Sequence, residues 1–239
     1  EDDSLLGGPF LVMTYLEGEP IPLGEDPPLR FQTPPGRGRI ATGVVDTLAD
    51  LHSVDVEPFA EVCDEVPVGD QVARNVRMLE DATGVTGHDP PGLWAVADWL
   101  QGNVPDYSPT GLVHGDFRPG NILFAGADEP EIGGVLDWET AFLGDPLTEL
   151  GYLLLRWRDG GDPTPSLDGI EERYDDAALL GDLEEVNEQG LAPFTNRPGS
   201  PTRAELIDRY EDRTGLAFDN GRFYRAFAAF TLATVWAAL

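Results

Sequence analysis

The chain has 239 residues and a formal net charge of −29, because 44 acidic residues stand against only 15 basic ones. All 15 basic residues are Arg, and the sequence contains no Lys. So acidic a chain repels nucleic acid and anionic membranes, and we expect neither as a partner. The length and the 41% of hydrophobic residues exclude wholesale disorder and are typical of a globular protein.

The acidic residues are spread along the chain and are not gathered in one block. This distribution favours a general adaptation to high salt over a local site for a cationic substrate, so we expect a halophilic protein. Cys63 is the only cysteine, which excludes a disulfide within the chain and indicates a reducing, cytoplasmic environment.

The first predicted element is a strand over residues 10–16, where aromatic and β-branched residues lie between segments rich in Gly and Pro. A connection rich in Pro and Gly follows over residues 18–38. Apolar residues then recur at helical spacing, which predicts three amphipathic helices, over about residues 40–52, around 72–79 and over 93–100.

Short apolar runs bounded by turn residues predict three strands, over residues 111–114, 121–124 and 132–136. Asp145 and Pro146 then open a helix as its N-cap and its first residue. Thr202 and Glu205 form a capping box for a helix that ends at Gly215, and a last helix follows. The predicted fold class is therefore α+β and mostly helical, with short β segments among the helices.

A polar cluster lies between two of the predicted strands, in the sequence His-Gly-Asp-Phe-Arg-Pro-Gly-Asn that begins at His114. Asp116 and Asn121 stand five residues apart, as in the catalytic loop of kinases, where the Asp accepts the proton of a hydroxyl and the Asn holds Mg²⁺. Asp137 ends the next apolar run, where kinases place another Mg²⁺ ligand. Because phosphoryl transfer needs mainly positioning and charge neutralisation, a rigid loop with one base and two oxygen ligands suits it.

These segments resemble the aminoglycoside phosphotransferase and choline kinase group of small-molecule kinases, whose fold is kinase-like. The resemblance is carried by His-Gly-Asp with Asn121 and by Val-Leu-Asp-Trp-Glu around Asp137. It extends over most of the chain from residue 10 to about residue 158. Three further segments are similar to the family's hinge, to its helix that ends in Leu-His and to its turn after the metal Asp, namely residues 10–19, 48–52 and 144–146.

The resemblance implies a protein-kinase-like C-terminal lobe with ATP and Mg²⁺ as cofactors and a small molecule as acceptor. It implies that Asp116 is the catalytic base, that Asn121 and Asp137 are Mg²⁺ ligands, and that Arg118 steadies charge on the transferred phosphate. For Arg118, an ordinary ion pair with a carboxylate is an equal alternative. The residues implied to contact the adenine of ATP are Met13, Thr14, Tyr15, Leu16 and Leu123.

The resemblance also implies two parts, the end of an N-terminal lobe with its hinge in residues 1–24 and the C-terminal lobe in residues 25–239. The second part holds a catalytic loop, a metal loop and a helical substrate region, over residues 112–124, 132–140 and 145–239. A complete kinase also needs an N-terminal lobe with a Lys that pairs the phosphates, and this sequence has no Lys. Either that lobe lies in a longer gene product, which a start at Glu1 instead of Met favours, or the chain is a remnant of the fold.

The leading hypothesis is an ATP- and Mg-dependent phosphotransferase that moves the γ-phosphate to a hydroxyl of a small molecule. The alternative is a non-catalytic nucleotide-binding or regulatory module of the same fold. A third hypothesis is a metal hydrolase, whose ligands would be His114, Asp116, Asp137 and Glu139. The acidic residues from 159 to 188 suit a cationic acceptor and a salt-adapted surface equally well.

Overall fold

The computed structural model describes residues 12–87, 89–162 and 190–238, with single positions at 7, 10, 164, 167, 178, 180, 181, 184, 187 and 188. The longer helices in these residues are α1 Pro34–His52, α2 Val68–Thr86, α3 Pro91–Gly102, α4 Pro146–Arg156, α6 Arg203–Thr214 and α7 Gly221–Ala238. The strands are β1 Gly111–Val113, β2 Ile122–Ala125, β3 Glu131–Val135 and β4 Phe142–Gly144. The mostly helical α+β class is confirmed.

The strands form two separate antiparallel pairs. β1 pairs with β4, so that Val113 lies opposite Phe142, and β2 pairs with β3, so that Ile122 lies opposite Val135. The three predicted strands are confirmed to within one residue at each end. β4 was not predicted, because three apolar residues next to a helix cap carry no periodic signal.

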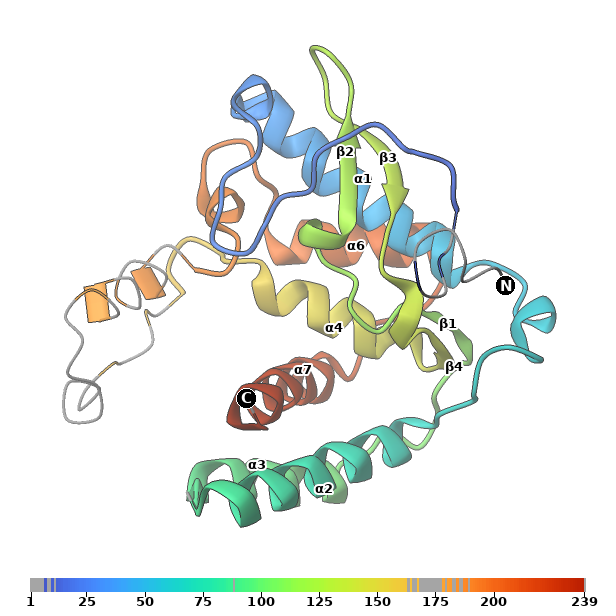
Figure 1. Ribbon diagram of the computed structural model, residues 1–239, viewed down its shortest axis with the longest axis vertical. Helices are drawn as coiled ribbons and strands as arrows, with labels where there is room; N and C mark the ends of the chain where they lie inside the picture. Colours follow the sequence, from blue (N-terminus) through green and yellow to red (C-terminus); the bar gives the residue numbers. More distant parts are fainter. Residues whose placement is uncertain are drawn as a thin grey trace.

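The helices pack in layers around α4 and α7 (Figure 1). α7 lies between α4 and the α2–α3 pair and contacts all three, while α1 packs against α6 and β3. The hydrophobic core runs continuously through these contacts, and its fully buried members include Leu48, Leu79, Leu150, Leu154 and Phe230. Ile122 and Phe124 belong to this core, so the β2–β3 pair packs against the helices.

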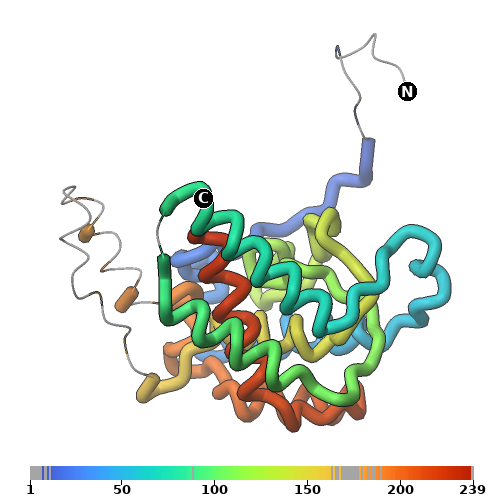
Figure 2. The backbone as a smooth tube through the Cα atoms, turned by 90° about the horizontal axis from the view of Figure 1, so that it is seen from below, coloured from blue at the N-terminus to red at the C-terminus, as the bar shows by residue number. Residues whose placement is uncertain are grey.

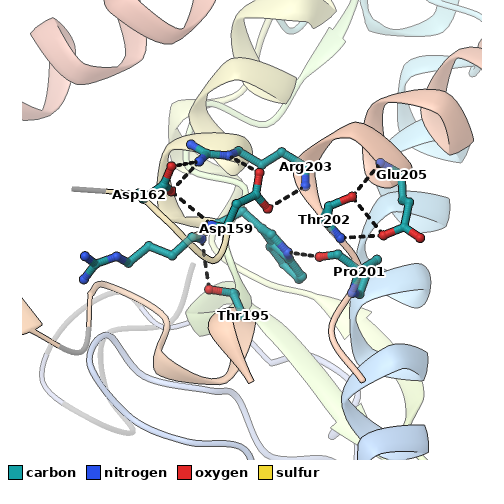
Figure 3. A network of polar contacts seen from close by, with 9 residues as sticks. Asp159, Asp162, Thr195, Pro201, Thr202, Arg203 and Glu205 are labelled. Atoms are coloured by element: carbon teal, nitrogen blue, oxygen red, sulfur yellow. Dashed lines mark hydrogen bonds and ion pairs between the residues drawn. The ribbon is translucent and has the colours of Figure 1, made fainter. Parts of the chain in front are cut away.

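The predicted helix caps are present. Oδ1 of Asp145 accepts a hydrogen bond from the N–H of Leu147 at 2.9 Å, and Oδ2 accepts one from the Tyr224 hydroxyl at 2.7 Å. Burial nevertheless raises the pKa of the Asp145 carboxyl. Thr202 and Glu205 form the capping box of α6 (Figure 3). The sequence therefore determines the start of both helices locally.

Two predictions at the amino-terminal end were wrong. Residues 12–18 form no strand, and Figure 2 shows this segment leaving the body of the molecule. A strand needs a hydrogen-bonded neighbour, and the first described residue with a bridge partner is Glu19, just after this segment and opposite Phe124. α1 begins at Pro34 and not near Ile40, because the Thr33 side chain accepts the N–H of Gly36 and caps it there. In the described part of the chain, no helix is both long and apolar enough to cross a membrane.

Candidate active site

Two segments cross side by side from one strand pair to the other, residues 114–121 from β1 to β2 and residues 136–141 from β3 to β4. They meet at Gly115, which has a φ of 88° and where a Cβ would lie 2.6 Å from the carbonyl oxygen of Thr140. The Thr140 hydroxyl donates to the carbonyl oxygen of His114 at 3.0 Å. Glycine alone satisfies both the backbone angle and the close approach, so Gly115 brings the predicted catalytic and metal loops into contact.

The carboxylate of Asp116 accepts hydrogen bonds from three side chains. Oδ2 accepts from Nε of Arg118 and from Nδ2 of Asn121, each at 2.9 Å, and Oδ1 accepts from the Tyr152 hydroxyl at 2.6 Å. Nδ2 of Asn121 also donates to the carbonyl oxygen of Asp116 at 2.9 Å. The structure thus brings Asp116, Arg118 and Asn121 together. Arg118 forms an ion pair with Asp116, the residue predicted to be the base.

Asn121 and Asp137 lie at the same end of the β2–β3 hairpin. The N–H of Leu136 donates to the carbonyl oxygen of Asn121 at 2.8 Å, which continues the ladder by one step beyond Ile122 and Val135. Asp137 follows with a φ of 70° and a ψ of 59°, the left-handed conformation. It is the one non-glycine residue with a positive φ in the part of the chain that the structure describes. Such backbone strain in a non-glycine residue concentrates at functional sites.

The donor atoms at this end suit a magnesium ion held together with a nucleotide. Because the amide nitrogen of Asn121 makes both bonds to Asp116, its amide oxygen is left for a cation. The Asp137 carboxylate adds a second hard oxygen, and Mg²⁺ is typically held by one or two such groups plus phosphate oxygens and water. Within the described ranges, no three or more His, Cys, Asp and Glu side chains are grouped to hold a metal. The four residues that the hydrolase hypothesis names are therefore not brought together as such a group.

His114 braces the loop. Its Nε2 donates to the carbonyl oxygen of Leu136 at 2.8 Å, and its Nδ1 accepts the N–H of Asp116 at 3.2 Å. The indole ring of Trp138 lies against the imidazole, with 4.7 Å between ring centroids. Since both ring nitrogens are engaged with the two loops, the histidine positions their backbones.

Glu149 of α4 is a supporting residue that the sequence analysis missed. Its two carboxylate oxygens accept the successive backbone N–H groups of His114 and Gly115, at 3.0 and 2.7 Å. Oε2 also accepts from Nε2 of His52 at 3.1 Å, and the other ring nitrogen of His52 is hydrogen-bonded to the Tyr210 hydroxyl at 2.8 Å. Glu149 is 2% exposed, so these bonds tie the catalytic loop to α1, α4 and α6 in the interior.

Tyr152 and Arg156, one and two turns further along α4, were also missed. The guanidinium of Arg156 donates to the Tyr152 hydroxyl at 2.6 Å and lies 3.8 Å from the centre of its ring. Burial raises the pKa of Tyr152 to about 12. A sequence signal did exist, because Asp145, Glu149, Tyr152 and Arg156 repeat at helical spacing in an otherwise apolar helix and so form one polar stripe.

The structure separates the residues predicted to contact adenine into two sets. Leu123 is buried in β2, and Leu16 lies near its partner strand, since a Cβ on Gly134 would come within 2.7 Å of the Leu16 side chain. By contrast, Met13 and Tyr15 are 72% and 86% exposed, and Thr14 between them is exposed as well. Of the five residues, Leu16, itself 43% exposed, and Leu123 are therefore the two that lie at this strand pair.

A cavity of about 540 Å³ opens beside the loop. Gly115, Glu139 and Tyr152 line it on the loop side, and α2 and α7 form the opposite walls. The amide of Asn75 donates to the hydroxyl of Thr231 at 2.6 Å and joins these two helices. The volume of this cavity is in the range of sites that enclose a small molecule.

The sequence model of a family described as "Phosphotransferase enzyme family" matches residues 1–188. Two relatives from Mus musculus are acyl-CoA dehydrogenase family member 10, 30% identical over 98% of this chain, and family member 11, 33% identical over 98%. The chain spans only 20% and 27% of the length of these two proteins.

Two solved structures have the same fold. A candidate aminoglycoside phosphotransferase from Ralstonia eutropha superposes with a TM-score of 0.69 and 23% identity, over 94% of this chain and 61% of that one. The aminoglycoside-3'-phosphotransferase of type VIII superposes with a TM-score of 0.56 and 16% identity, over 90% of this chain and 66% of that one. The chain accordingly has the kinase-like phosphotransferase fold.

Proposed function

The chain belongs to the phosphotransferase enzyme family, and on this premise we propose that it transfers the γ-phosphoryl group of ATP to a hydroxyl of a small molecule. In this proposal Asp116 is the base, and Asn121 and Asp137 are the Mg²⁺ ligands. Leu16 and Leu123 contribute to the nucleotide site. The single Cys63 is compatible with a reducing compartment such as the cytoplasm.

The observation that carries the proposal is the geometry of the two adjacent loops. A carboxylate is fixed by Asn121 and Arg118, and Asn121 lies at the same end of the β2–β3 hairpin as the strained Asp137. This arrangement supports one base and two hard oxygen ligands on a rigid frame, which is what phosphoryl transfer requires of a protein.

The residues act through position and charge. Asp116 accepts the proton of the acceptor hydroxyl while the acceptor oxygen bonds to the γ-phosphorus and ADP leaves. Arg118, at present on Oδ2 of Asp116, lies close enough to the base to offset negative charge on the transferred group. When bound, Mg²⁺ neutralises the β- and γ-phosphates. The cavity lined by Gly115 and Tyr152 is our candidate for the acceptor site.

Calorimetric titration with ATP in the presence and absence of Mg²⁺ tests whether the chain binds the nucleotide and whether Asp137 is a ligand of Mg²⁺. Asp137→Asn should weaken Mg-ATP binding about tenfold or more and leave Mg-free ATP binding unchanged, because it removes one ligand charge. Asp208→Asn, an exposed carboxylate of α6, is the matched control and should bind as the parent does. Equal Mg-ATP affinity in all three proteins would refute the metal assignment.

A nucleotide-binding module without transfer is the second candidate, because the sequence contains no Lys to pair the α- and β-phosphates. Such a module would bind Mg-ATP and release no ADP with any acceptor. Measurement of ADP release therefore separates the two candidates.

A further inference from the structure

The carboxylate of Asp116 has one acceptor position left that an incoming hydroxyl can use. An ionised carboxylate offers about four acceptor positions, two on each oxygen. Those of Oδ2 are filled by Arg118 and Asn121, and one of the two on Oδ1 is filled by Tyr152. A hydroxyl that gives its proton to Asp116 must therefore approach Oδ1 next to the Tyr152 phenol.

Tyr152 also lies between the cavity and Asp116. Its side chain lines the cavity, whereas that of Asp116 does not. Tyr152 therefore contacts both the cavity and Asp116, and an acceptor hydroxyl that reaches Asp116 from the cavity passes the Tyr152 hydroxyl. This contact spans 36 residues of sequence and joins the middle of α4 to the catalytic loop.

Arg156 fixes the direction of the Tyr152 hydrogen bond. Arg156 is 5% exposed. Its guanidinium lies over the phenol ring and donates to the Tyr152 hydroxyl and, at 3.2 Å, to the backbone carbonyl oxygen of Tyr152. Because a guanidinium has only donors, the hydroxyl accepts from Arg156 and its own proton goes to Asp116. With a pKa of about 12, Tyr152 keeps that proton at neutral pH.

We propose that Tyr152, braced by Arg156, is a positioning residue that holds Oδ1 of Asp116 toward the acceptor cavity. This proposal rests on the phosphotransferase function proposed above. The phenol keeps its proton throughout. The acceptor hydroxyl takes the second position on Oδ1 and passes its proton to Asp116, while its oxygen bonds to the γ-phosphorus and the bond from that phosphorus to ADP breaks.

Tyr152→Phe tests the proposal, since it keeps the ring that stacks on Arg156 and removes only the hydroxyl. Tyr224→Phe is the matched control, because the Tyr224 hydroxyl also donates to a carboxylate, that of Asp145, at 2.7 Å. Water serves as the acceptor, so the kcat for ADP release from Mg-ATP is measured together with the Kd of Mg-ATP and with Tm. Crystal structures of the parent and of Tyr152→Phe give the orientation of the Asp116 carboxylate without reference to turnover.

We expect Tyr152→Phe to lower kcat about tenfold, the value of one hydrogen bond to a charged group, with the Kd of Mg-ATP unchanged and the Asp116 carboxylate rotated or disordered. Tyr224→Phe should lower Tm and leave kcat within about twofold. An unchanged or increased kcat in Tyr152→Phe, or a loss of Mg-ATP affinity that parallels the loss of kcat, would overturn the proposal. If the parent releases no ADP with water or with any of a panel of hydroxyl compounds, the phosphotransferase function fails. An Asp116 carboxylate that stays in place in the Tyr152→Phe crystal rejects the positioning role whatever the turnover.

Discussion

Two networks of polar contacts lie along α4 and differ in the burial of the carboxylates on which they depend, Glu149 within the helix and Asp159 with Asp162 just after its last turn. In the site network, Glu149 and Tyr152 join α4 to the catalytic loop, and the Glu149 side chain is 1% exposed. In the surface network, Arg203 at the start of α6 pairs with Asp159 and Asp162 just after α4 (Figure 3). Their carboxylates are 29% and 27% exposed.

The difference teaches that burial, and not residue type, decides what each network does. Water cannot replace a bond lost around Glu149, so an unpaired N–H there costs its full desolvation free energy. Around Arg203, water and salt ions substitute readily. The site network therefore fixes the loop that carries Asp116. The surface network contributes only modestly to the contact between α6 and the end of α4.

The largest effect is expected at Glu149. Glu149→Gln keeps the shape of the side chain but turns an amide N–H₂ toward the N–H groups of the catalytic loop. We expect a loss of about 2–3 kcal/mol in the free energy of unfolding, which lowers Tm by about 5–10 °C. The kcat for ADP release should fall at least about tenfold, because the loop that carries Asp116 is no longer fixed.

Glu205→Gln is the matched control in the surface network, since Glu205 belongs to the exposed capping box of α6. It should lower Tm by less than about 2 °C and leave kcat unchanged. If both Gln variants lose stability and activity equally, burial does not distinguish the two networks.

Arg203→Met should have a smaller effect, about 1 kcal/mol or less at pH 7. Burial raises the pKa of Asp162, but hydrogen bonds from the N–H of Asp159 and from Arg203 outweigh it, so that this pKa lies below its ordinary value of 3.8. The stabilisation is therefore present above about pH 4 and is lost as the pH falls through the folded-state pKa. In thermal melts the difference between parent and variant should be constant from pH 7 to about pH 5 and shrink below pH 4. A constant difference down to pH 2 contradicts this linkage.

The smallest expected effects are changes of Tm with salt concentration. At 1 M KCl the screening length is about 3 Å, so the Tm deficit of Arg203→Met should shrink, while that of Glu149→Gln persists. The parent itself should gain stability, because the repulsion within a net charge of −29 is screened. Full stability in dilute buffer with no gain in molar KCl would speak against salt adaptation.

The features that the sequence predicted are those that neighbouring residues determine. The caps at Asp145 and Thr202 and the strand–loop–strand segment around Asp116 each depend on a few adjacent residues. The contact between Asp116 and Asn121 could be predicted for the same reason, because the two residues are only five apart and the structure joins them by hydrogen bonds.

The features that the sequence did not predict depend on distant partners. Glu149 and Tyr152 reach residues 34 to 36 positions away, and a polar residue on α4 shows no partner in the sequence. The strand predicted over residues 10–16 is absent from the described part of that segment for a related reason. Strand propensity is local, but a strand also needs a neighbour with which to pair.

The role of Asp116 as the base is tested most directly by ADP release from Mg-ATP across a panel of hydroxyl compounds, with the parent and Asp116→Asn compared at low and high salt. We expect the parent to release ADP with at least one acceptor, and Asp116→Asn to be slower by about 10³-fold with its Mg-ATP affinity retained. Equal rates for the two proteins would contradict the assignment of Asp116 as the base.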